Sequence, residues 1–432
     1  MPLAVKLRRF LWRFRQLGLW DRSFRRSDAQ RLTVVSQFFP PDYAATGQLL
    51  DDLTARLAQS GTHIQVLTGM PSYAFSQADA EPVEFQPNRV IFRSRASRLW
   101  PRRVRGRAVN GVLFCFRVCL RLLKYSRRGD LLCYTTEPPY LPVVGWLVYC
   151  ITRTPYVLVL YDLYPDVLVE LGILDERHPF TRFWRQCNRY AYRSARDLIV
   201  LSEPMRRRVE FFTPEFAAGG RLHVIPSWAD TDVIRPIPKA NNWFVQRYGL
   251  AETFNIIYSG NQGRCHDLVT LMATALLLRR NSRIRFVFIG AGPQNGRIRA
   301  LAADWGLTNC LFLPYQDMEV LPWSLNSADL AVVSLGIGSV GLVAPSKLYG
   351  HLAAGTPLLI ISPADSDLRI LAEPDLGAWF SNGDADGIAR WIESVSSNPE
   401  LLSPLSDNCR RLAVESYSGD SVTRLYSTVL RL

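Results

Sequence analysis

Three times between residues 254 and 360, an apolar run of strand length passes into a glycine-containing turn and then into a helical pattern. The runs begin at Phe254, Arg285 and Ala328, and the turns that follow them contain Gly260, Gly290 and Gly341. A strand, a tight turn and a helix in regular alternation are typical of a doubly wound parallel sheet. The C-terminal half is therefore predicted to be an α/β nucleotide-binding domain.

The N-terminal half repeats this pattern. Strands are expected at residues 32–39 and 63–69, at the start of the segment 130–142, which ends in a Pro-rich loop, and in the segment 156–172. Thr46-Gly47 opens a predicted helix that runs to about Ser60. A chain of 432 residues exceeds one typical domain. The sequence therefore predicts two α/β domains, each with its own core.

The segment from Gly341 to Ile360 has the features of a phosphate-binding site. It follows a strand pattern, contains Pro-Ser-Lys and runs into a short helix that stops at Gly355. The first N–H groups of a helix are free and lie at the positive end of its dipole, so they attract anions. With Lys347 close by, the segment is expected to bind a diphosphate at the carboxyl end of a strand.

Four motifs in this order carry a resemblance to a known family: YSGNQGR (258–264), FVFIGAGP (286–293), LFLPYQ (311–316) and VAPSKLYGHLAAGTP (343–357). The chain resembles family 4 glycosyltransferases, in particular the branch that builds bacterial capsule, colanic-acid or O-antigen polysaccharides. The resemblance implies the GT-B fold, with two Rossmann-like domains facing a central cleft.

The resemblance also implies domain boundaries and a donor site. After the basic segment 1–30, which is drawn from the residues themselves, it implies an acceptor domain (31–228), a donor domain (229–405) and a final helix (406–432) that crosses back to the acceptor domain. Arg264 and Lys347 are expected to stabilise the departing diphosphate, because fixed cations can stabilise a leaving anion without a metal. The residues expected to bind the donor are Ser259, Gly260, Asn261, Gly290, Gly292, Tyr315, Gly341, Leu342, Val343, Ser346 and Leu348.

One departure concerns the donor ribose. Many relatives carry two glutamates eight residues apart, but the matching positions here are Leu342 and Gly350. Either a neighbour such as Tyr349 or His351 replaces the second carboxylate, or backbone groups alone hold the sugar.

Acceptor or sugar contacts are expected from Gly47, Glu137, Asp162 and Asp166, which follow strands of the N-terminal half. The carboxylates could equally be structural. The histidine that many relatives carry in the 135–137 region is absent, and no general base is assigned.

Relatives retain the anomeric configuration, and the leaving phosphate can itself take the acceptor proton. We expect no cofactor and no metal, because the five histidines lack ligand spacing and Asp365-Ser-Asp367 resembles a helix cap. The donor is expected to be a nucleotide-diphosphate sugar, with UDP favoured by family habit.

Positive charge is concentrated near the N-terminus. The first 130 residues hold 23 of the 51 Lys and Arg but only 9 of the 38 Asp and Glu. Between Phe85 and Gly129 there is no acid, whereas eight arginines lie between Arg89 and Arg107. Such a charge indicates an anionic partner for this half of the chain.

The accompanying apolar residues favour a membrane surface over nucleic acid. In residues 1–27, leucines, phenylalanines and two tryptophans recur at helical spacing between Lys and Arg, which is typical of an interfacial helix. Val112, Phe116 and Leu120 belong to a second stripe, which either docks on lipid or faces the protein core. Residues 1–27 and the 89–128 basic region are thus expected to bind an anionic membrane.

The apolar stretch from Pro139 to Ile151 is too short to cross a bilayer, and a secretory signal is not expected. These features together predict a peripheral enzyme on the cytoplasmic face of the plasma membrane, acting on a polyprenyl-diphosphate-linked glycan. Two alternatives stay open at this point: another GT-B activity such as a nucleotide-sugar epimerase, and a catalytically silent membrane or nucleic-acid binding protein.

Overall fold

The computed structural model describes residues 31–432 except 43, 72–79, 95–103, 127–128, 217–218 and 373–374. The predicted membrane segment 1–30 therefore lies outside the described residues. The chain divides into two compact units. The first ends at Leu160 and adds Cys187–Ile199 and Ser427–Leu432, and the second comprises Tyr161–Gln186 and Val200–Tyr426. The domain boundaries drawn from the sequence stay a prediction.

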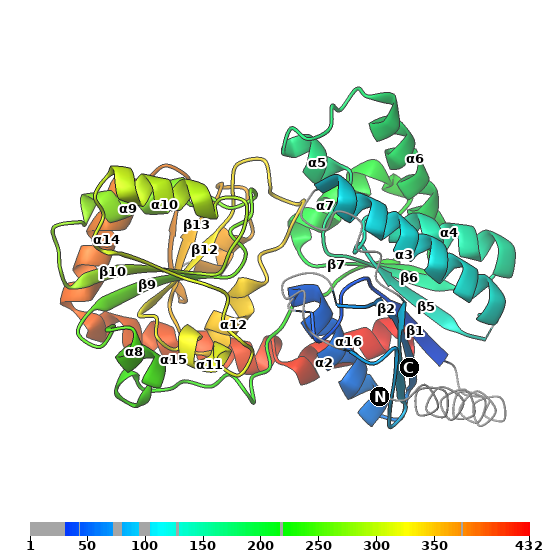
Figure 1. Ribbon diagram of the computed structural model, residues 1–432, viewed down its shortest axis with the longest axis horizontal. Helices are drawn as coiled ribbons and strands as arrows, with labels where there is room; N and C mark the ends of the chain where they lie inside the picture. Colours follow the sequence, from blue (N-terminus) through cyan, green and yellow to red (C-terminus); the bar gives the residue numbers. More distant parts are fainter. Residues whose placement is uncertain are drawn as a thin grey trace, which may run out of the picture. The chain divides into compact units, whose positions relative to one another are not determined.

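The first sheet has the strand order β3-β4-β2-β1-β5-β6-β7-β8 (Figure 1). The central strand β1 pairs in parallel with β2 and β5, whereas β3 pairs antiparallel with β4. The strands are β1 (Arg31–Val35), β2 (His63–Gly69), β3 (Val83–Gln86), β4 (Arg89–Ser94), β5 (Leu131–Thr135), β6 (Tyr156–Leu160), β7 (Asp197–Val200) and β8 (Leu222–Val224).

Apolar, β-branched runs form these strands because both faces of the sheet are covered. All residues of β1, β5 and β6 are buried, for example. The helices between the strands are α2 (Ala45–Gln59), α3 (Val104–Tyr125), α4 (Leu141–Thr152), α5 (Asp166–Glu170), α6 (Pro179–Ser194) and α7 (Glu203–Phe212).

The second sheet is parallel, with the order β11-β10-β9-β12-β13-β14. Its strands are β9 (Phe254–Ser259), β10 (Ile284–Ile289), β11 (Cys310–Leu313), β12 (Leu330–Ser334), β13 (Leu358–Ile361) and β14 (Gly377–Phe380). Its helices are α8 (Trp243–Arg247), α9 (Val269–Leu277), α10 (Asn295–Asp304), α11 (Leu321–Leu325), α12 (Lys347–Ala353), α13 (Leu368–Ala372), α14 (Ala385–Ser397) and α15 (Ser403–Ser416).

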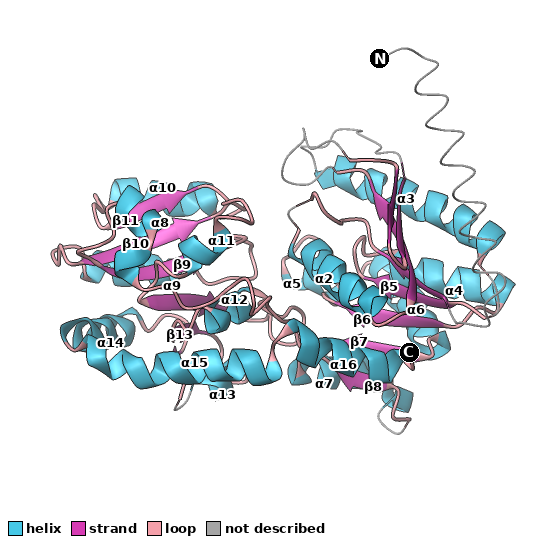
Figure 2. Cartoon of the chain, turned by 90° about the horizontal axis from the view of Figure 1, so that it is seen from below, coloured by secondary structure: helices cyan, strands magenta, loops and turns pink. Residues whose placement is uncertain are grey.

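Helices cover both faces of this second sheet, as Figure 2 shows. Side chains alternate along a strand. In β12, Leu330 and Val332 pack with α9, α10 and α14, whereas Ala331 and Val333 pack with α12 and α15. Both expected doubly wound sheets are therefore present.

In each sheet the strands that follow the first strand in sequence lie on one side of it, and the later strands lie on the other side. This change of direction falls between β1 and β5 in one sheet and between β9 and β12 in the other. Ligands of such sheets bind outside the carboxyl ends of the strands at this switch point. The topology thus directs attention to the segments that follow β1 and β5, and to those that follow β9 and β12.

Two sequence-based element predictions need correction. After the Gly260 turn, the sequence predicts a helix from about His266, but α9 begins at Val269, so His266 lies in the connection after β9. The single final helix is two helices, α15 and α16 (Gly419–Leu430), interrupted at Tyr417 and Ser418. The break follows from capping, since the Ser418 hydroxyl accepts a hydrogen bond from the N–H of Ser421, 3.3 Å away.

Candidate functional site

The turns that follow β9 and β10 pack directly against each other. Gly260 and Gly290 have φ angles of +122° and +124°, a region that glycine alone adopts readily. The N–H of Gly260 donates to the carbonyl of Ile289 at 2.9 Å. A Cβ on Gly290 would lie 2.2 Å from the carbonyl oxygen of Gly260. Gly290 is therefore required by the close approach of two backbones, whereas Gly260 is favoured by its positive φ angle.

The other predicted donor residues of this region gather around the same turns. A Cβ on Gly292 would lie 2.6 Å from the carbonyl oxygen of Gln262 and 2.7 Å from Oδ1 of Asn261. The hydroxyl of Tyr315 donates to the carbonyl of Ala291 at 3.2 Å. The fold thus brings the donor residues predicted after β9, β10 and β11 together at one edge of the sheet.

Lys347 reaches this edge from the first position of α12. Its Nζ lies 2.6 Å from the hydroxyl oxygen of Tyr258 and 3.3 Å from Nε2 of His266. Its Cε lies 3.5 Å from where a Cβ of Gly260 would be. Lys347 therefore lies against the turn after β9, as predicted for a cation that binds a diphosphate.

The electrostatics around Lys347 are unusual for a lysine. Burial lowers the pKa of its ammonium group to about 7. Burial, followed by the charge of Lys347, lowers the pKa of His266 to about 3. Among the described residues, no Asp or Glu oxygen lies within ion-pair distance of Lys347. Lys347 is half-buried, and a partly desolvated cation without a counter-ion is costly, so the site favours an incoming anion.

Arg264, the second predicted catalytic cation, is exposed in the segment that follows β9. It forms no hydrogen bond or ion pair with any residue that the structure describes. Its guanidinium is thus available to a ligand, but the structure does not hold it beside Lys347, and its role stays a prediction.

Few side chains of the 341–348 segment are accessible for the predicted contacts with the donor. Leu342 and Leu348 are 1% and 2% exposed, and Leu348 belongs to the core beneath α12. Of the remaining predicted contacts, Gly341 has a φ of +72°, Val343 is half-buried and Ser346 is exposed. The N–H of Leu342 already donates to the carbonyl of Ser339 at 3.1 Å. A ligand at this loop would therefore meet the backbone of Leu348 and the side chain of Ser346.

The proposed substitutes for the missing glutamate face the protein interior. Tyr349 packs edge-on against Tyr417, with ring centroids 5.1 Å apart. His351 is fully buried, and neither of its ring nitrogens has a hydrogen-bond partner among the described residues. A Cβ on Gly350 would lie 3.0 Å from Cδ1 of Leu325. Position 350 thus faces an apolar side chain.

Two predicted acceptor residues come together at the switch point of the first sheet. The hydroxyl of Thr46 donates to Oε1 of Glu137 at 3.1 Å, and the N–H of Gln37 donates to the carbonyl of Glu137 at 2.8 Å. A Cβ on Gly47 would lie 3.0 Å from the carbonyl of Phe38, so glycine allows α2 to approach the end of β1. The half-buried carboxylate of Glu137 lies within this arrangement.

Asp162 and Asp166 differ in their surroundings. Asp166 is buried at the start of α5 and forms an ion pair of 2.7 Å with Arg185, which is a structural role. Asp162 is half-buried, and burial raises its pKa to about 6. Asp162 is therefore the better of the two candidates for contact with a substrate.

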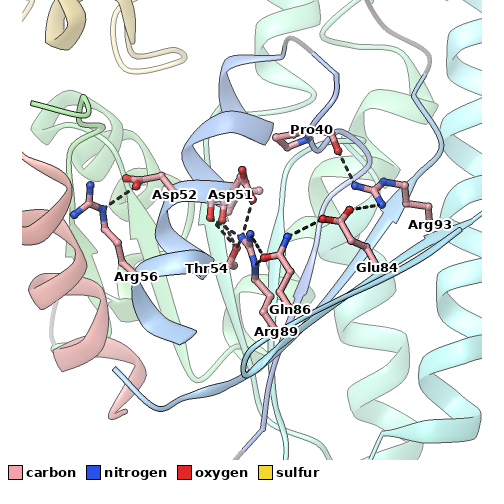
Figure 3. Close-up of polar contacts among 10 residues, drawn as sticks. Pro40, Asp51, Asp52, Thr54, Arg56, Glu84, Gln86, Arg89 and Arg93 are labelled. Carbon is pink, nitrogen blue, oxygen red and sulfur yellow. Dashed lines mark hydrogen bonds and ion pairs between the residues drawn. The ribbon is translucent and has the colours of Figure 1, made fainter. Parts of the chain in front are cut away.

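Part of the predicted basic patch is buried. Arg89 and Arg93 are 5% and 8% exposed and form ion pairs with Asp51 (2.7 Å) and Glu84 (3.0 Å). Arg93 also donates to the carbonyl of Pro40 at 2.8 Å (Figure 3). The prediction that Arg89 and Arg93 present charge to a membrane is wrong, because they tie α2, β3 and β4 together.

The structure shows which face of the helix α3 packs on the core. Phe114, Val118 and Leu122 are buried, whereas Val112, Phe116 and Leu120 are 52%, 61% and 53% exposed. Of the two alternatives for this stripe, the three residues do not face the core, and docking on lipid stays a prediction.

The sequence reasoning missed Tyr258 and His266 as members of the site. Tyr258 is the penultimate residue of β9, and His266 lies seven residues beyond that strand's end. Polar side chains so close to the switch point of a doubly wound sheet were the available signal. Among the described residues, no three His, Cys, Asp or Glu side chains are grouped as metal ligands.

Two family models match the chain. The Glycosyl transferase 4-like domain matches residues 45–228, and the Glycosyl transferases group 1 domain matches residues 251–412. The chain belongs to the family 4 glycosyltransferases. The predictions of the family and of a transferase activity are thereby confirmed.

Curated relatives agree with this assignment. The chain is 24% identical over 396 residues to the probable glycosyltransferase WbjE of Pseudomonas aeruginosa, covering 90% of this chain and 94% of that protein. It is 23% identical over 217 residues to LpsE of Rhizobium meliloti, a lipopolysaccharide core biosynthesis glycosyltransferase, covering 50% and 56%.

Solved structures confirm the GT-B fold. Sucrose-phosphate synthase from Thermosynechococcus elongatus has a TM-score of 0.72 at 18% identity, covering 93% of this chain and 98% of its own. Anabaena HepE, solved with UDP-glucose, has a TM-score of 0.68 at 15% identity, covering 93% and 99%.

Proposed function

We propose that this glycosyltransferase moves a sugar from a nucleotide-diphosphate donor to a polyprenyl-diphosphate-linked glycan in cell-surface polysaccharide biosynthesis. Transfer proceeds with retention and without metal. The observation that carries the donor half of this proposal is the position of Lys347. Its half-buried ammonium group has no carboxylate partner among the described residues and lies against the turn after β9.

The chemistry follows from the charge that develops during transfer. Breaking the anomeric bond leaves a diphosphate, which Lys347 and Arg264 stabilise together with free N–H groups of the 341–348 loop. The leaving phosphate accepts the proton of the attacking hydroxyl, so no protein base is assigned. Glu137 and Asp162 are the candidates for contact with the acceptor or the transferred sugar.

The donor nucleotide is proposed to be UDP. HepE, which shares the fold, was solved with UDP-glucose, and the name of LpsE places that relative in lipopolysaccharide biosynthesis. The HepE complex supports a nucleotide sugar as the donor, and the name of LpsE supports a cell-surface glycan as the product.

The experiment that tests the function is a screen of UDP- and GDP-sugars for release of the nucleoside diphosphate, with a bacterial membrane extract as acceptor. We expect one donor to be consumed only when the extract is present, with activity intact in a chelator. Loss of activity in the chelator would overturn metal independence. Absence of turnover with every donor would favour the catalytically silent alternative.

We also propose that the enzyme works on the inner face of the plasma membrane. Support comes from α3, where Val112, Phe116 and Leu120 form an exposed apolar stripe on a helix without carboxylates, beside the exposed Arg117 and Lys124. In Figure 1, α4 lies beside α3, and Leu147 and Ile151 of α4 are exposed as well. Apolar area flanked by cations binds anionic bilayers.

A matched pair of variants tests the membrane proposal. We expect Phe116→Ser with Leu120→Ser to lower binding to vesicles of anionic phospholipid, and deletion of residues 1–27 to lower it further, with strong salt dependence. Ile370→Ser is the control, because Ile370 is 79% exposed but lies on α13 of the second sheet. Equal binding of the α3 double variant and the control would contradict a role for α3.

No helix of the described residues is long and apolar enough to cross a membrane.

A further inference from the structure

The ammonium group of Lys347 has one hydrogen that the protein does not use. A lysine has three N–H donors. In Lys347 one is directed at the Tyr258 hydroxyl, 2.6 Å away, and another at Nε2 of His266, 3.3 Å away. No third acceptor is present among the described residues. One donor of a largely enclosed cation therefore remains available.

His266 is held in the neutral tautomer whose Nε2 accepts a hydrogen bond from Lys347. Its Nδ1 lies 2.7 Å from the carbonyl oxygen of Ser334 at the end of β12. Because a carbonyl only accepts, Nδ1 carries the proton and Nε2 presents its lone pair. The connection after β9 and the end of β12 thus fix the imidazole as an acceptor for the lysine.

The phenol is held in the same way. The hydroxyl of Tyr258 donates to the carbonyl of Asn261 at 2.7 Å, so its oxygen lone pairs face Lys347. The ring of Tyr258 also lies under the ammonium, with Nζ 4.2 Å from the ring centroid, which is favourable for a cation. Both contacts stabilise the charged form of Lys347 without neutralising it.

We propose that Tyr258 and His266 are positioning residues that hold the ammonium of Lys347 charged and oriented, with its remaining N–H directed at the donor diphosphate. This inference rests on the proposed function. The stem of Lys347 packs along the turn after β9, since a Cβ on Gly260 would be in ordinary van der Waals contact with Cε of Lys347, 3.5 Å away.

The arrangement makes donor binding depend on pH. The titratable groups near the ammonium are Tyr258 on β9, His266 in the connection after β9 and His351 on α12. Burial raises the pKa of the tyrosine and lowers the pKa of each histidine. All three groups are therefore neutral at pH 7. The pKa of Lys347 in the free protein is about 7. A bound diphosphate favours the protonated form, so affinity falls as the pH rises above 7.

The test is a titration with UDP between pH 5.5 and 9. The variant Lys347→Met, which lacks the ammonium, is titrated in parallel, so that the pH dependence caused by the ionisation of UDP itself can be subtracted. We expect the midpoint of the wild-type profile near pH 7 to move down by about one unit in Tyr258→Phe and in His266→Leu. At pH 7.5 the dissociation constant should rise about tenfold. His266→Gln, which keeps one donor and one acceptor, should stay close to wild type.

Tyr248→Phe is the matched control, since Tyr248 packs on Phe244 at 4.5 Å between ring centroids, away from Lys347. A purely structural role would weaken UDP binding equally at every pH and leave the midpoint in place. Unchanged midpoints in both Tyr258→Phe and His266→Leu, with weak binding in Lys347→Met, would refute the positioning role and leave the donor site standing. If Tyr258→Phe fails to fold, the two His266 variants decide.

Failure of the wild-type protein to bind UDP or GDP at any pH would overturn the proposed function, and this inference with it.

Discussion

The ammonium nitrogen of Lys347 lies 2.6 Å from the phenol oxygen of Tyr258, although 89 residues separate them in the chain. The contact joins the start of α12 to the end of β9, across the switch point of the second sheet. It places a cation where doubly wound folds bind phosphates.

Removal of either predicted cation should slow transfer. We expect Lys347→Ala and Arg264→Ala each to cost roughly 2–4 kcal/mol in kcat/KM for the donor, as loss of a fixed anion-stabilising group does. Steady-state assays of nucleotide release measure the effect. Arg247→Ala is a control, because Arg247 lies on α8 and stacks on Tyr248. Wild-type turnover in either active-site variant would remove that residue from the catalytic set.

Lys347 should also lower the stability of the ligand-free protein. Its pKa is about 7 in the folded chain, below the 10.5 of a free lysine. Between these values the unfolded chain binds more protons, so stability rises with pH across this window. We expect Lys347→Met to be more stable than wild type by about 1–3 kcal/mol at pH 6.5, with a smaller difference at pH 9. Denaturant unfolding at the two pH values provides the check, and a constant difference would contradict the lowered pKa.

Gly290 should tolerate no side chain. A Cβ there would lie 2.2 Å from the Gly260 carbonyl, at a φ of +124°. Gly290→Ala is expected to displace the turn after β9, lowering stability by roughly 1–3 kcal/mol and weakening UDP binding. The control Gly296→Ala lies on α10 with no atom within 4 Å of the new Cβ, and should be neutral or stabilising. Equal UDP affinity in both variants would show that the packed turns do not shape the donor site.

Gly350→Glu tests whether the carboxylate of the relatives can be restored. Because a Cβ at this position faces Leu325 at 3.0 Å, we expect the variant to lose stability and to gain no affinity for UDP. Gly350→Ala separates the cost of the methyl group from that of the charge. Tighter UDP binding by Gly350→Glu would mean that the ribose contact is still geometrically available.

Glu137→Gln should affect the acceptor rather than the donor. The variant keeps an oxygen for the Thr46 hydroxyl, 3.1 Å away, but removes the charge. We expect a several-fold rise in the KM for the acceptor with unchanged UDP affinity. Comparison with Glu176→Gln, an exposed carboxylate on the surface, controls for net charge. An unchanged acceptor KM would assign Glu137 a structural role.

Periodicity and turn residues predicted both sheets, because buried parallel strands require continuous apolar runs and tight turns require glycine. The same apolar runs, with the turn residues that follow them, directed attention to Gly260, Gly290 and Lys347. The exposure of side chains was harder to predict. The sequence predicted that Arg89 and Arg93 belong to an exposed basic region, yet in the fold they form ion pairs with Asp51 and Glu84.

The amino-acid sequence by itself determined the fold class and the family, and it predicted the segments proposed to bind the donor, since each depends on local patterns and their order. Only the tertiary structure decided that Tyr258 and His266 hold Lys347, that α3 exposes Phe116 and that Gly350 faces Leu325. These relationships arise where segments far apart in the chain meet, and packing rather than local propensity selects which side chains face each other.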